Sequence, residues 1–275
     1  MDRKSCVAIV PVYRSPGDAF ERMSFKATCS KYRYKVTDAL YVITYDGMDL
    51  SEYEEIASSC GVSFEVSYFP KEYFQGIHGY NLMMLGPAIY RRFEEFEYML
   101  ICQLDAMILG NDLQRWTEEG YDYIGGPISA PGCRHTVHFA TVGNGGFCLR
   151  KISAMLKALG EEGPLTLKEM LKMKRPSNPK FTPTKRLLYT LMVCASGRSS
   201  RLRGFISHWV MEDMYFSFAL QGSPWQLRVP SPIEASRFAL DLDPDFWYME
   251  NGNVIPFGAH KFGEYYDGFY KNIIQ

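Results

Sequence analysis

The chain has 275 residues, 47% of them hydrophobic, and a formal net charge of -1 at pH 7. This length allows one large α/β domain or two small ones with a substantial core. The balanced charge gives no support to a general nucleic-acid binder, and no apolar window of eighteen or more residues could span a membrane. The seven cysteines are scattered without a Cys-x-x-Cys pair, which favours reduced thiols in a cytoplasmic protein over disulfides or a zinc site.

Apolar runs and helix-period patterns alternate along the first half of the chain. They predict a first strand from residue 7 to Pro11 or just after it, further strands at 40–45, 62–69 and 121–127, and helices at 19–29, 50–60 and about 82–93. Alternation of this kind implies a mostly parallel sheet with right-handed crossovers. The first strand, with its loop and helix, is also how nucleotide-binding α/β units begin, although most α/β proteins begin in the same way.

Residues 98–109 form an almost unbroken apolar run that contains one carboxylate, Asp105. A short run of this kind is typical of a strand that is buried on both faces. An ionised carboxylate there is costly unless it is paired. We therefore expect Asp105 either to cap the strand or pair with an Arg, or to meet a metal ion or an opening at a strand end.

A glycine-rich patch at 142–150 surrounds Asn144. Its three glycines let the backbone approach a ligand closely or adopt positive φ, and Arg150 can reach an anionic group at its end. The alternative interpretation is a glycine-rich turn before a helix that begins near Ser153, and the pattern favours both equally.

The composition shifts at 167–203, where ten Lys or Arg side chains accompany one acidic residue, Glu169. Apolar residues are interleaved with the basic ones. Such a segment can lie on an anionic membrane surface or grip a polyphosphate-bearing substrate. The alternative is a solvated insertion, and prolines at 176, 179 and 183 exclude a helix through its middle.

Two further places carry candidate chemistry. Glu212 and Asp213 are adjacent acids in an apolar, aromatic neighbourhood. On a helix they would project about 100° apart, so that one faces a cleft while the other makes a structural contact. His260 follows a short apolar segment in a Gly-containing loop, and it is either a hydrogen-bonded structural residue or a metal ligand close to a carboxylate.

Taken in order, these features resemble the GT-A class of nucleotide-sugar-dependent glycosyltransferases. The closest likeness is to an uncharacterised bacterial family described as glycosyltransferases, and it covers nearly the whole chain apart from the basic segment. It is carried by residues 10–14, 79–81, 103–106, 121–127, 143–150, 212–213 and 256–260. The resemblance implies a single GT-A-like (Rossmann-like) domain over residues 1–275, a three-layer α/β/α fold with a mostly parallel sheet and an insertion at about 167–203.

The resemblance also implies roles for individual residues. Asp105 matches the last Asp of an Asp-x-Asp motif that holds a divalent cation, Mn²⁺ or Mg²⁺, and His260 matches a C-terminal His that completes the metal site. Asp213 matches the base of inverting fringe-like enzymes, with Glu212 in support. The residues expected at the donor site are Pro11, Val12, Tyr13, Arg14, Asn81, Gln103, Asp105, Asn144, Gly145 and Gly146.

The implied function is transfer of a sugar from a nucleotide-diphosphate sugar, with a UDP-sugar favoured, to a glycan or lipid-linked glycan, with inversion, in bacterial surface polysaccharide synthesis. The protein would be cytoplasmic, with residues 167–203 on the inner face of the membrane.

One position departs from the family pattern, because Gln103 occupies the place of the first Asp. It supports one alternative, a non-catalytic protein that binds nucleotide-sugars or glycans. A second alternative is a retaining transferase. A nucleotidyltransferase is disfavoured because no glycine-rich, Lys- or Arg-bearing phosphate loop follows the first strand.

Overall fold

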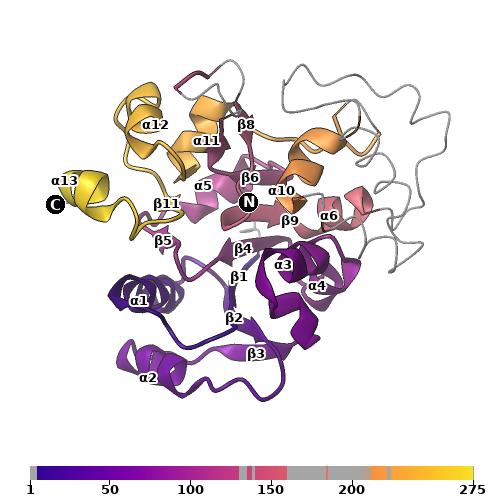
Figure 1. Cartoon of the computed structure of the whole chain (residues 1–275), viewed down its shortest axis with the longest axis vertical. Coiled ribbons are helices and arrows are strands. Elements are labelled where there is room, and N and C mark those ends of the chain that lie inside the picture. Colours follow the sequence, from indigo (N-terminus) through magenta and orange to yellow (C-terminus); the bar gives the residue numbers. More distant parts are fainter. Residues whose placement is uncertain are drawn as a thin grey trace.

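The computed structural model describes residues 5–129, 135–137, 140–159, 184, 208, 211–221 and 224–274. A six-stranded sheet runs through the middle of these residues in the order β3-β2-β1-β4-β9-β6 (Figure 1). The first four strands in this order are parallel, while β9 is antiparallel to both of its neighbours. The sheet strands are β1 (Cys6–Pro11), β2 (Ala39–Thr44), β3 (Glu65–Tyr68), β4 (Tyr98–Cys102), β6 (Tyr123–Gly125) and β9 (Phe147–Lys151).

Helices cover both faces of this sheet, and side chains alternate between two cores. One core contains Val7, Ile9 and residues of α3, α4 and α6, and the other contains Ala8, Val10 and residues of α1, α2 and α5. The mostly parallel three-layer α/β/α fold expected from the sequence is therefore confirmed. The helices are α1 (Ala19–Arg33), α2 (Ser51–Ser59), α3 (Gly76–Met84), α4 (Pro87–Arg92), α5 (Leu113–Glu118) and α6 (Ile152–Ala158).

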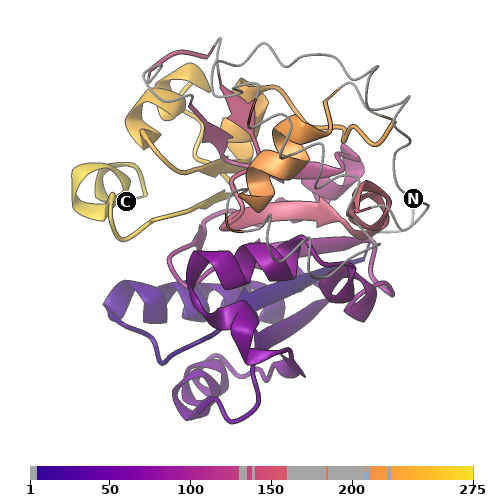
Figure 2. The ribbon, with the colours of Figure 1, turned by 45° about the vertical axis from the view of Figure 1, so that its right-hand side comes forward.

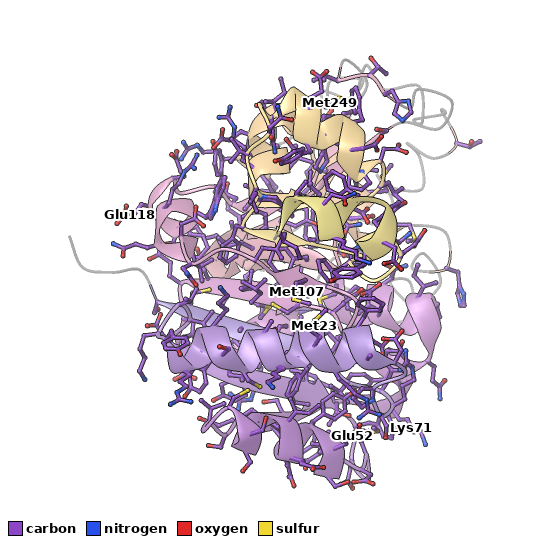
Figure 3. The ribbon with its side chains drawn as sticks, turned by 90° about the vertical axis from the view of Figure 1, so that its left-hand side faces the viewer. Met23, Glu52, Lys71, Met107, Glu118 and Met249 are labelled. Carbon is purple, nitrogen blue, oxygen red and sulfur yellow. The ribbon has the colours of Figure 1, made fainter. Side chains whose placement is uncertain are left out.

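The central strands are apolar throughout because neither face meets water. All six residues of β1 and all five of β4 are buried, as continuous apolar runs predict for doubly covered parallel strands. Figure 3 shows α1 lying along one face, with Met23 on its outer side and Met107 near the adjoining C-terminal region. The Ser24 hydroxyl donates to the Ala106 carbonyl, which ties α1 to the turn that carries Asp105.

A second, three-stranded sheet has the order β10-β11-β5, in which β10 (Ala239–Leu240) and β11 (Gly258–Ala259) are parallel and β5 (Met107–Ile108) is antiparallel to β11. Residues that follow β10 and β11 therefore meet the residues that precede β5. This topology brings three distant stretches of the sequence to one point.

The remaining elements complete the second half of the chain. Figure 2 shows the later segments, orange to yellow, gathered on one side of the main sheet. They include α10 (Glu212–Met214), the π-helix η2 (Tyr215–Ala219), α11 (Pro232–Phe238), α12 (Pro244–Glu250), the π-helix η3 (Tyr266–Tyr270) and α13 (Lys271–Ile273). The short elements β7 (Pro127–Ile128), β8 (Thr141–Val142) and the 3₁₀-helix η1 (Lys71–Phe74) lie earlier in the chain.

Two predicted elements are wrong in extent. The helix expected at 82–93 is instead the end of α3 followed by α4, because Pro87 begins a new helix and cannot donate a backbone hydrogen bond within an old one. The strand expected at 98–109 is broken after Cys102 by a turn in which the Ala106 N–H donates to the Gln103 carbonyl at 2.9 Å. The break places Asp105 beyond a strand end and out of the core.

The basic segment at 167–203 lies outside the described residues apart from Thr184. Among the described residues, no helix is both long and apolar enough to cross a membrane. All five described cysteines are free thiols.

Candidate functional site

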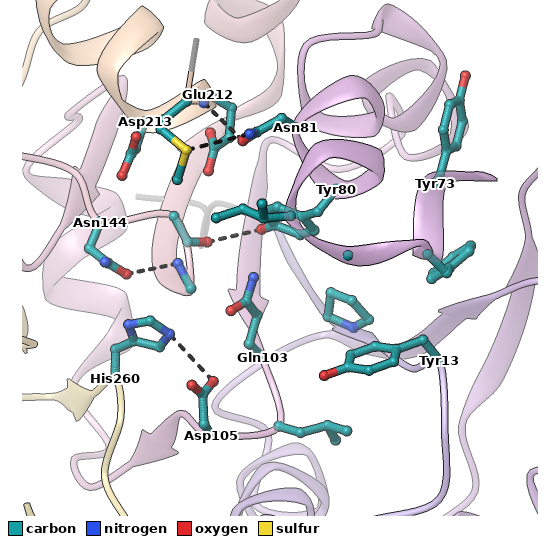
Figure 4. Close-up of a pocket in the computed structure, with 18 of the residues that line it drawn as sticks. Tyr13, Tyr73, Tyr80, Asn81, Gln103, Asp105, Asn144, Glu212, Asp213 and His260 are labelled. Atoms are coloured by element: carbon teal, nitrogen blue, oxygen red, sulfur yellow. Dashed lines mark hydrogen bonds and ion pairs between the residues drawn. The ribbon is translucent and has the colours of Figure 1, made fainter. Parts of the chain in front are cut away.

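A pocket of about 470 Å³ lies beyond the carboxyl ends of β1 and β4, which is where the strand order of a doubly wound sheet reverses and where ligands of such folds bind. Twelve of the thirteen predicted site residues line it. They are Pro11, Tyr13, Arg14, Asn81, Gln103, Asp105, Asn144, Gly145, Gly146, Glu212, Asp213 and His260. Figure 4 shows ten of the lining side chains labelled around this space.

Val12 is the predicted site residue that the structure does not bring into the pocket. Its side chain is fully buried in the core on the α1 face of the sheet. The alternation of side chains along extended backbone explains the difference, since the neighbours Pro11 and Tyr13 face the pocket.

One wall of the pocket is built by Asp105, His260 and a third residue, Asp241. His260 Nδ1 lies 2.9 Å from Asp241 Oδ1, and His260 Nε2 lies 3.4 Å from Asp105 Oδ1. Asp241 is 3% exposed, whereas the Asp105 side chain is 46% exposed. The histidine thus connects a buried carboxylate to one that faces the pocket.

The charges on this wall shift the pKa values of its two pocket-facing groups. Burial by itself lowers the pKa of His260, but hydrogen bonds and charge from Asp105 and Asp241 outweigh it and raise the pKa to about 9. Burial raises the pKa of Asp105, and His260 outweighs that effect so that the pKa lies below its usual value. Asp105 therefore holds a negative charge near neutral pH.

Asn144 and Gly146 fix the same wall from the glycine-rich patch. The Asn144 side-chain amide donates to Asp241 Oδ2 at 2.8 Å and accepts from the Gly146 N–H at 2.8 Å. A Cβ on Gly146 would collide with the His260 ring, so this position requires glycine for the ring to approach. The patch is consequently a wall of the site as well as the turn that enters β9.

The opposite wall holds Glu212 and Asp213 at the start of α10. Glu212 is 3% exposed and forms an ion pair with Arg150, with Nη2 and Oε2 2.7 Å apart. Arg150 is itself fully buried, donates to the Tyr90 hydroxyl at 2.8 Å and packs on the Tyr123 and Phe216 rings. The anionic partner of Arg150 is thus a residue of this chain. A Cβ on Gly145 would collide with Glu212.

Asp213 lies beside this ion pair. Among the described residues, none of its hydrogen-bond partners is a cationic side chain. Its carboxylate accepts the Met214 N–H at 2.6 Å. Burial and the negative charge of Glu212 raise the pKa of Asp213 to about 7. Both acids line the pocket. Glu212 makes a structural contact, and Asp213 is able to gain or lose a proton near neutral pH.

Asn81 and Tyr80 from α3 form hydrogen bonds to the start of α10 and to the glycine-rich patch. Asn81 Oδ1 accepts the Glu212 N–H at 3.1 Å, and its amide donates to Met211 Sδ at 3.6 Å. The Tyr80 hydroxyl donates to the Gly145 carbonyl at 3.0 Å. Asn81, predicted at the donor site, is 3% exposed and positions the start of α10.

The Asp105 wall fits a divalent cation in one specific way. Among the described residues, no group of three or more His, Cys, Asp or Glu side chains could hold a metal ion. Nε2 of His260 is nevertheless buried and faces Asp105, 3.4 Å from Oδ1. Asp241 on Nδ1 is the kind of outer carboxylate that orients histidine ligands. Two ligands suffice for Mg²⁺ or Mn²⁺ when water and substrate phosphates supply the others.

Sequence reasoning missed Asp241 and the structural role of Arg150. Asp241 follows the apolar residues 238–240, the same pattern of a carboxylate after a buried strand that singled out Asp105. This sequence pattern was present at Asp241. A strand of two residues, however, cannot be recognised from the sequence without the strand that pairs with it.

The solved structures that are similar to the chain include two glycosyltransferases. The crystal structure of mouse xyloside xylosyltransferase 1 in its apo form is 12% identical with a TM-score of 0.47, over 94% of this chain and 96% of that chain. That of core-mannan synthase A from Aspergillus fumigatus in its Mn/GDP form is 8% identical with a TM-score of 0.40, over 92% of this chain and 86% of that one.

No curated protein matches the sequence. A family model described as "Protein of unknown function (DUF5672)" matches residues 63–260, which include both walls of the pocket from Asn81 to His260. The chain therefore belongs to the family of unknown function DUF5672.

Proposed function

We propose that the chain transfers a sugar from a nucleotide-diphosphate sugar, with a UDP-sugar favoured, to a hydroxyl of a glycan or lipid-linked glycan, with inversion at the anomeric carbon. The observation that carries the proposal is that two carboxyl groups of one pocket have pKa values shifted in opposite directions. The pKa of Asp213 is raised to about 7, whereas that of Asp105 is lowered beside His260. Groups shifted apart in this way suit a proton acceptor and a charge-binding carboxylate respectively.

Asp213 acts as the base in this proposal. It takes the proton of the acceptor hydroxyl while the hydroxyl oxygen attacks the anomeric carbon, and the bond from that carbon to the diphosphate oxygen breaks. The nucleoside diphosphate leaves with the electron pair. A base of this kind contributes roughly 10²–10⁴-fold to the rate.

Asp105 and His260, the latter after release of its Nε2 proton, would hold the cation that the resemblance implies, Mn²⁺ or Mg²⁺. When bound, such a cation neutralises the negative charge that develops on the leaving diphosphate. Asp241 keeps the His260 ring oriented through Nδ1, so that Nε2 faces Asp105. Gln103, in the place of a first Asp, leaves a neutral amide on this side of the pocket.

A thermal-shift screen against UDP, GDP, CDP and dTDP, each with and without Mn²⁺, tests the proposal. A ligand that binds the native state raises the unfolding midpoint in proportion to RT ln(1 + [L]/Kd). We expect one nucleotide to stabilise the protein only with Mn²⁺ and to lose its effect in Asp105→Ala. Asp245→Ala, at an exposed position of α12, is the matched control. Absence of any shift with all four nucleotides would reject the donor class.

The second candidate is a non-catalytic protein that binds nucleotide-sugars or glycans. Gln103 and the two-residue metal wall are the observations in its favour. It predicts nucleotide binding without turnover of any acceptor. A retaining transferase differs in the product, since the anomeric configuration seen by NMR would be that of the donor.

Contact with an anionic membrane surface through residues 167–203 is part of the same proposal, as is a lipid-linked acceptor in bacterial surface polysaccharide synthesis. The charge of that segment supports it. If deletion of 167–203 left co-sedimentation with anionic liposomes unchanged, the membrane role would be rejected.

A further inference from the structure

Two exposed apolar side chains line the same pocket as the proposed base. Ile77, in the first turn of α3, is 63% exposed, and Met211, just before α10, is 40% exposed. Both line the same pocket as Asp213. Exposed apolar groups are ordinary when scattered singly, but these two come from separate elements and line one pocket, and we call this pair the rim.

The rim is held in a fixed position relative to Asp213. Asn81, one turn after Ile77 on α3, accepts the Glu212 N–H and donates to Met211 Sδ. Glu212 is held by its buried ion pair with Arg150. An acceptor that touches Ile77 and Met211 is therefore placed at a set distance from the carboxylate of Asp213, as substrate positioning requires.

The charges around the pocket disfavour an anionic acceptor. Among the described lining residues, the basic side chains are Arg14 and His260. Arg14 is paired with Glu21 at 2.7 Å, and His260 lies between Asp105 and Asp241. Arg150 is committed to Glu212. An anionic group beside Asp213 would meet uncompensated negative charge of the same sign.

The side of the pocket that carries Asp213 is separate from the side proposed for the diphosphate. Figure 4 shows Asp213, Glu212 and Asn81 on one side of the space and Asp105 with His260 on the other. The donor phosphates belong with the second group in the proposed function, so the first side is left for the acceptor.

We propose that Ile77 and Met211 form an acceptor subsite that takes a neutral glycoside with an apolar group next to its reacting sugar. This inference rests on the proposed glycosyltransferase function and names its acceptor class. The apolar group packs on Ile77 and Met211, and the neutral sugar presents a hydroxyl to Asp213. Alkyl or aryl aglycones share this chemistry.

Ligand-observed NMR with matched glycosides tests the subsite. The probes are methyl and n-hexyl β-glycosides of glucose, galactose, mannose and xylose, and n-hexyl glucuronide, with UDP and Mn²⁺ present. For at least one sugar we expect the hexyl probe to bind wild type about tenfold or more tightly than the methyl probe, because buried methylenes favour binding. The glucuronide should bind at least about tenfold more weakly than hexyl glucoside.

Ile77→Ser combined with Met211→Ser should reduce the hexyl preference to below about threefold, because its apolar partners are gone. Ile255→Ser, at a 49% exposed position outside the pocket, is the matched control and should keep the preference. An unchanged unfolding midpoint checks that the variants fold.

A hexyl preference that is absent in wild type, or that survives in the double variant, would overturn the subsite. So would a preference lost equally in Ile255→Ser, or a glucuronide that binds as well as the glucoside. Nucleotide binding without a hexyl preference rejects the subsite alone, whereas a hexyl preference without any nucleotide binding rejects the transferase.

Discussion

The two walls of the pocket each pair a buried carboxylate with one that faces the pocket, yet they neutralise the buried group differently. On one wall, Arg150 neutralises Glu212 and nothing comparable reaches Asp213, so the pKa of Asp213 rises to about 7. On the other, His260 lies between Asp241 and Asp105, and the pKa of Asp105 falls. Arg150 contacts only the buried acid of its wall, whereas His260 contacts both acids of the other wall. This difference decides which wall can accept a proton.

The largest expected effect concerns Asp213, which no cationic side chain of the described residues neutralises. Asp213→Asn should reduce kcat by roughly 10²–10⁴-fold, because the amide cannot take the acceptor proton. Nucleotide binding should stay within about twofold, since Asp213 faces the opposite side from Asp105. Steady-state kinetics and a nucleotide titration measure both quantities, and Asp245→Asn serves as the control. Unchanged turnover would remove Asp213 from the mechanism.

Removal of the buried cation tests what neutralises Glu212. Arg150→Met should lower the free energy of unfolding by about 3–5 kcal/mol, because it leaves a buried carboxylate unpaired. Chemical denaturation measures the loss. Arg115→Met breaks the exposed pair with Glu234, which is also 2.7 Å long, and should lower stability by only about 0–1 kcal/mol.

The double variant Arg150→Met with Glu212→Leu separates the charge from the packing. It should recover most of the lost stability, since apolar replacement of a whole buried pair is often neutral. An equal loss in the single and double variants would instead assign the effect to packing against Tyr123 and Phe216.

Asp241→Asn tests the wall in which the cationic group lies between the acids. The change should weaken Mn²⁺-dependent nucleotide binding by about 10–100-fold, as loss of an outer carboxylate behind a histidine ligand does. Titration of Mn²⁺ at fixed nucleotide gives the value. An unaltered Mn²⁺ requirement would count against the role of Asp241.

The two walls also differ in the pH dependence that they predict. The base form of Asp213 is populated above its pKa of about 7, so kcat/KM should fall about tenfold per pH unit below that value. Glu212, Arg150 and Asp241 are the charged groups that act on this carboxyl. A rate independent of pH between 5 and 8 would contradict the assignment.

Stability gives a second readout of the same shift. The raised pKa means that native Asp213 keeps a proton that the unfolded chain releases at its ordinary pKa of 3.8. Its stabilising contribution is therefore complete below about pH 4 and is lost as the pH rises to about 7. Denaturation at several pH values should show Asp213→Asn gaining stability relative to wild type over this window.

The sequence predicted the strands and the pocket-lining residues of the site better than the contacts between its side chains. The continuous apolar runs at β1 and β4 identified doubly covered strands, and Tyr13 and Gln103, which follow these runs, line the pocket. Arg150 was expected to meet an anionic group, but its partner Glu212 lies 62 positions away and could not be paired from composition. Asp241 was invisible because β10 has only two residues and exists through its pairing with β11.

The sequence by itself determined the alternation of strands and helices and the presence of acids next to apolar runs, because local periodicity and the aversion of carboxylates to burial act on neighbouring residues. Only the tertiary structure decided which acid meets which cation. The antiparallel β5 beside β11 brings Asp105 to His260, and the packing of α10 on α3 and β9 brings Glu212 to Arg150. Distances between residues so far apart in the chain depend on the whole fold, and the electrostatics of the pocket depends on those distances.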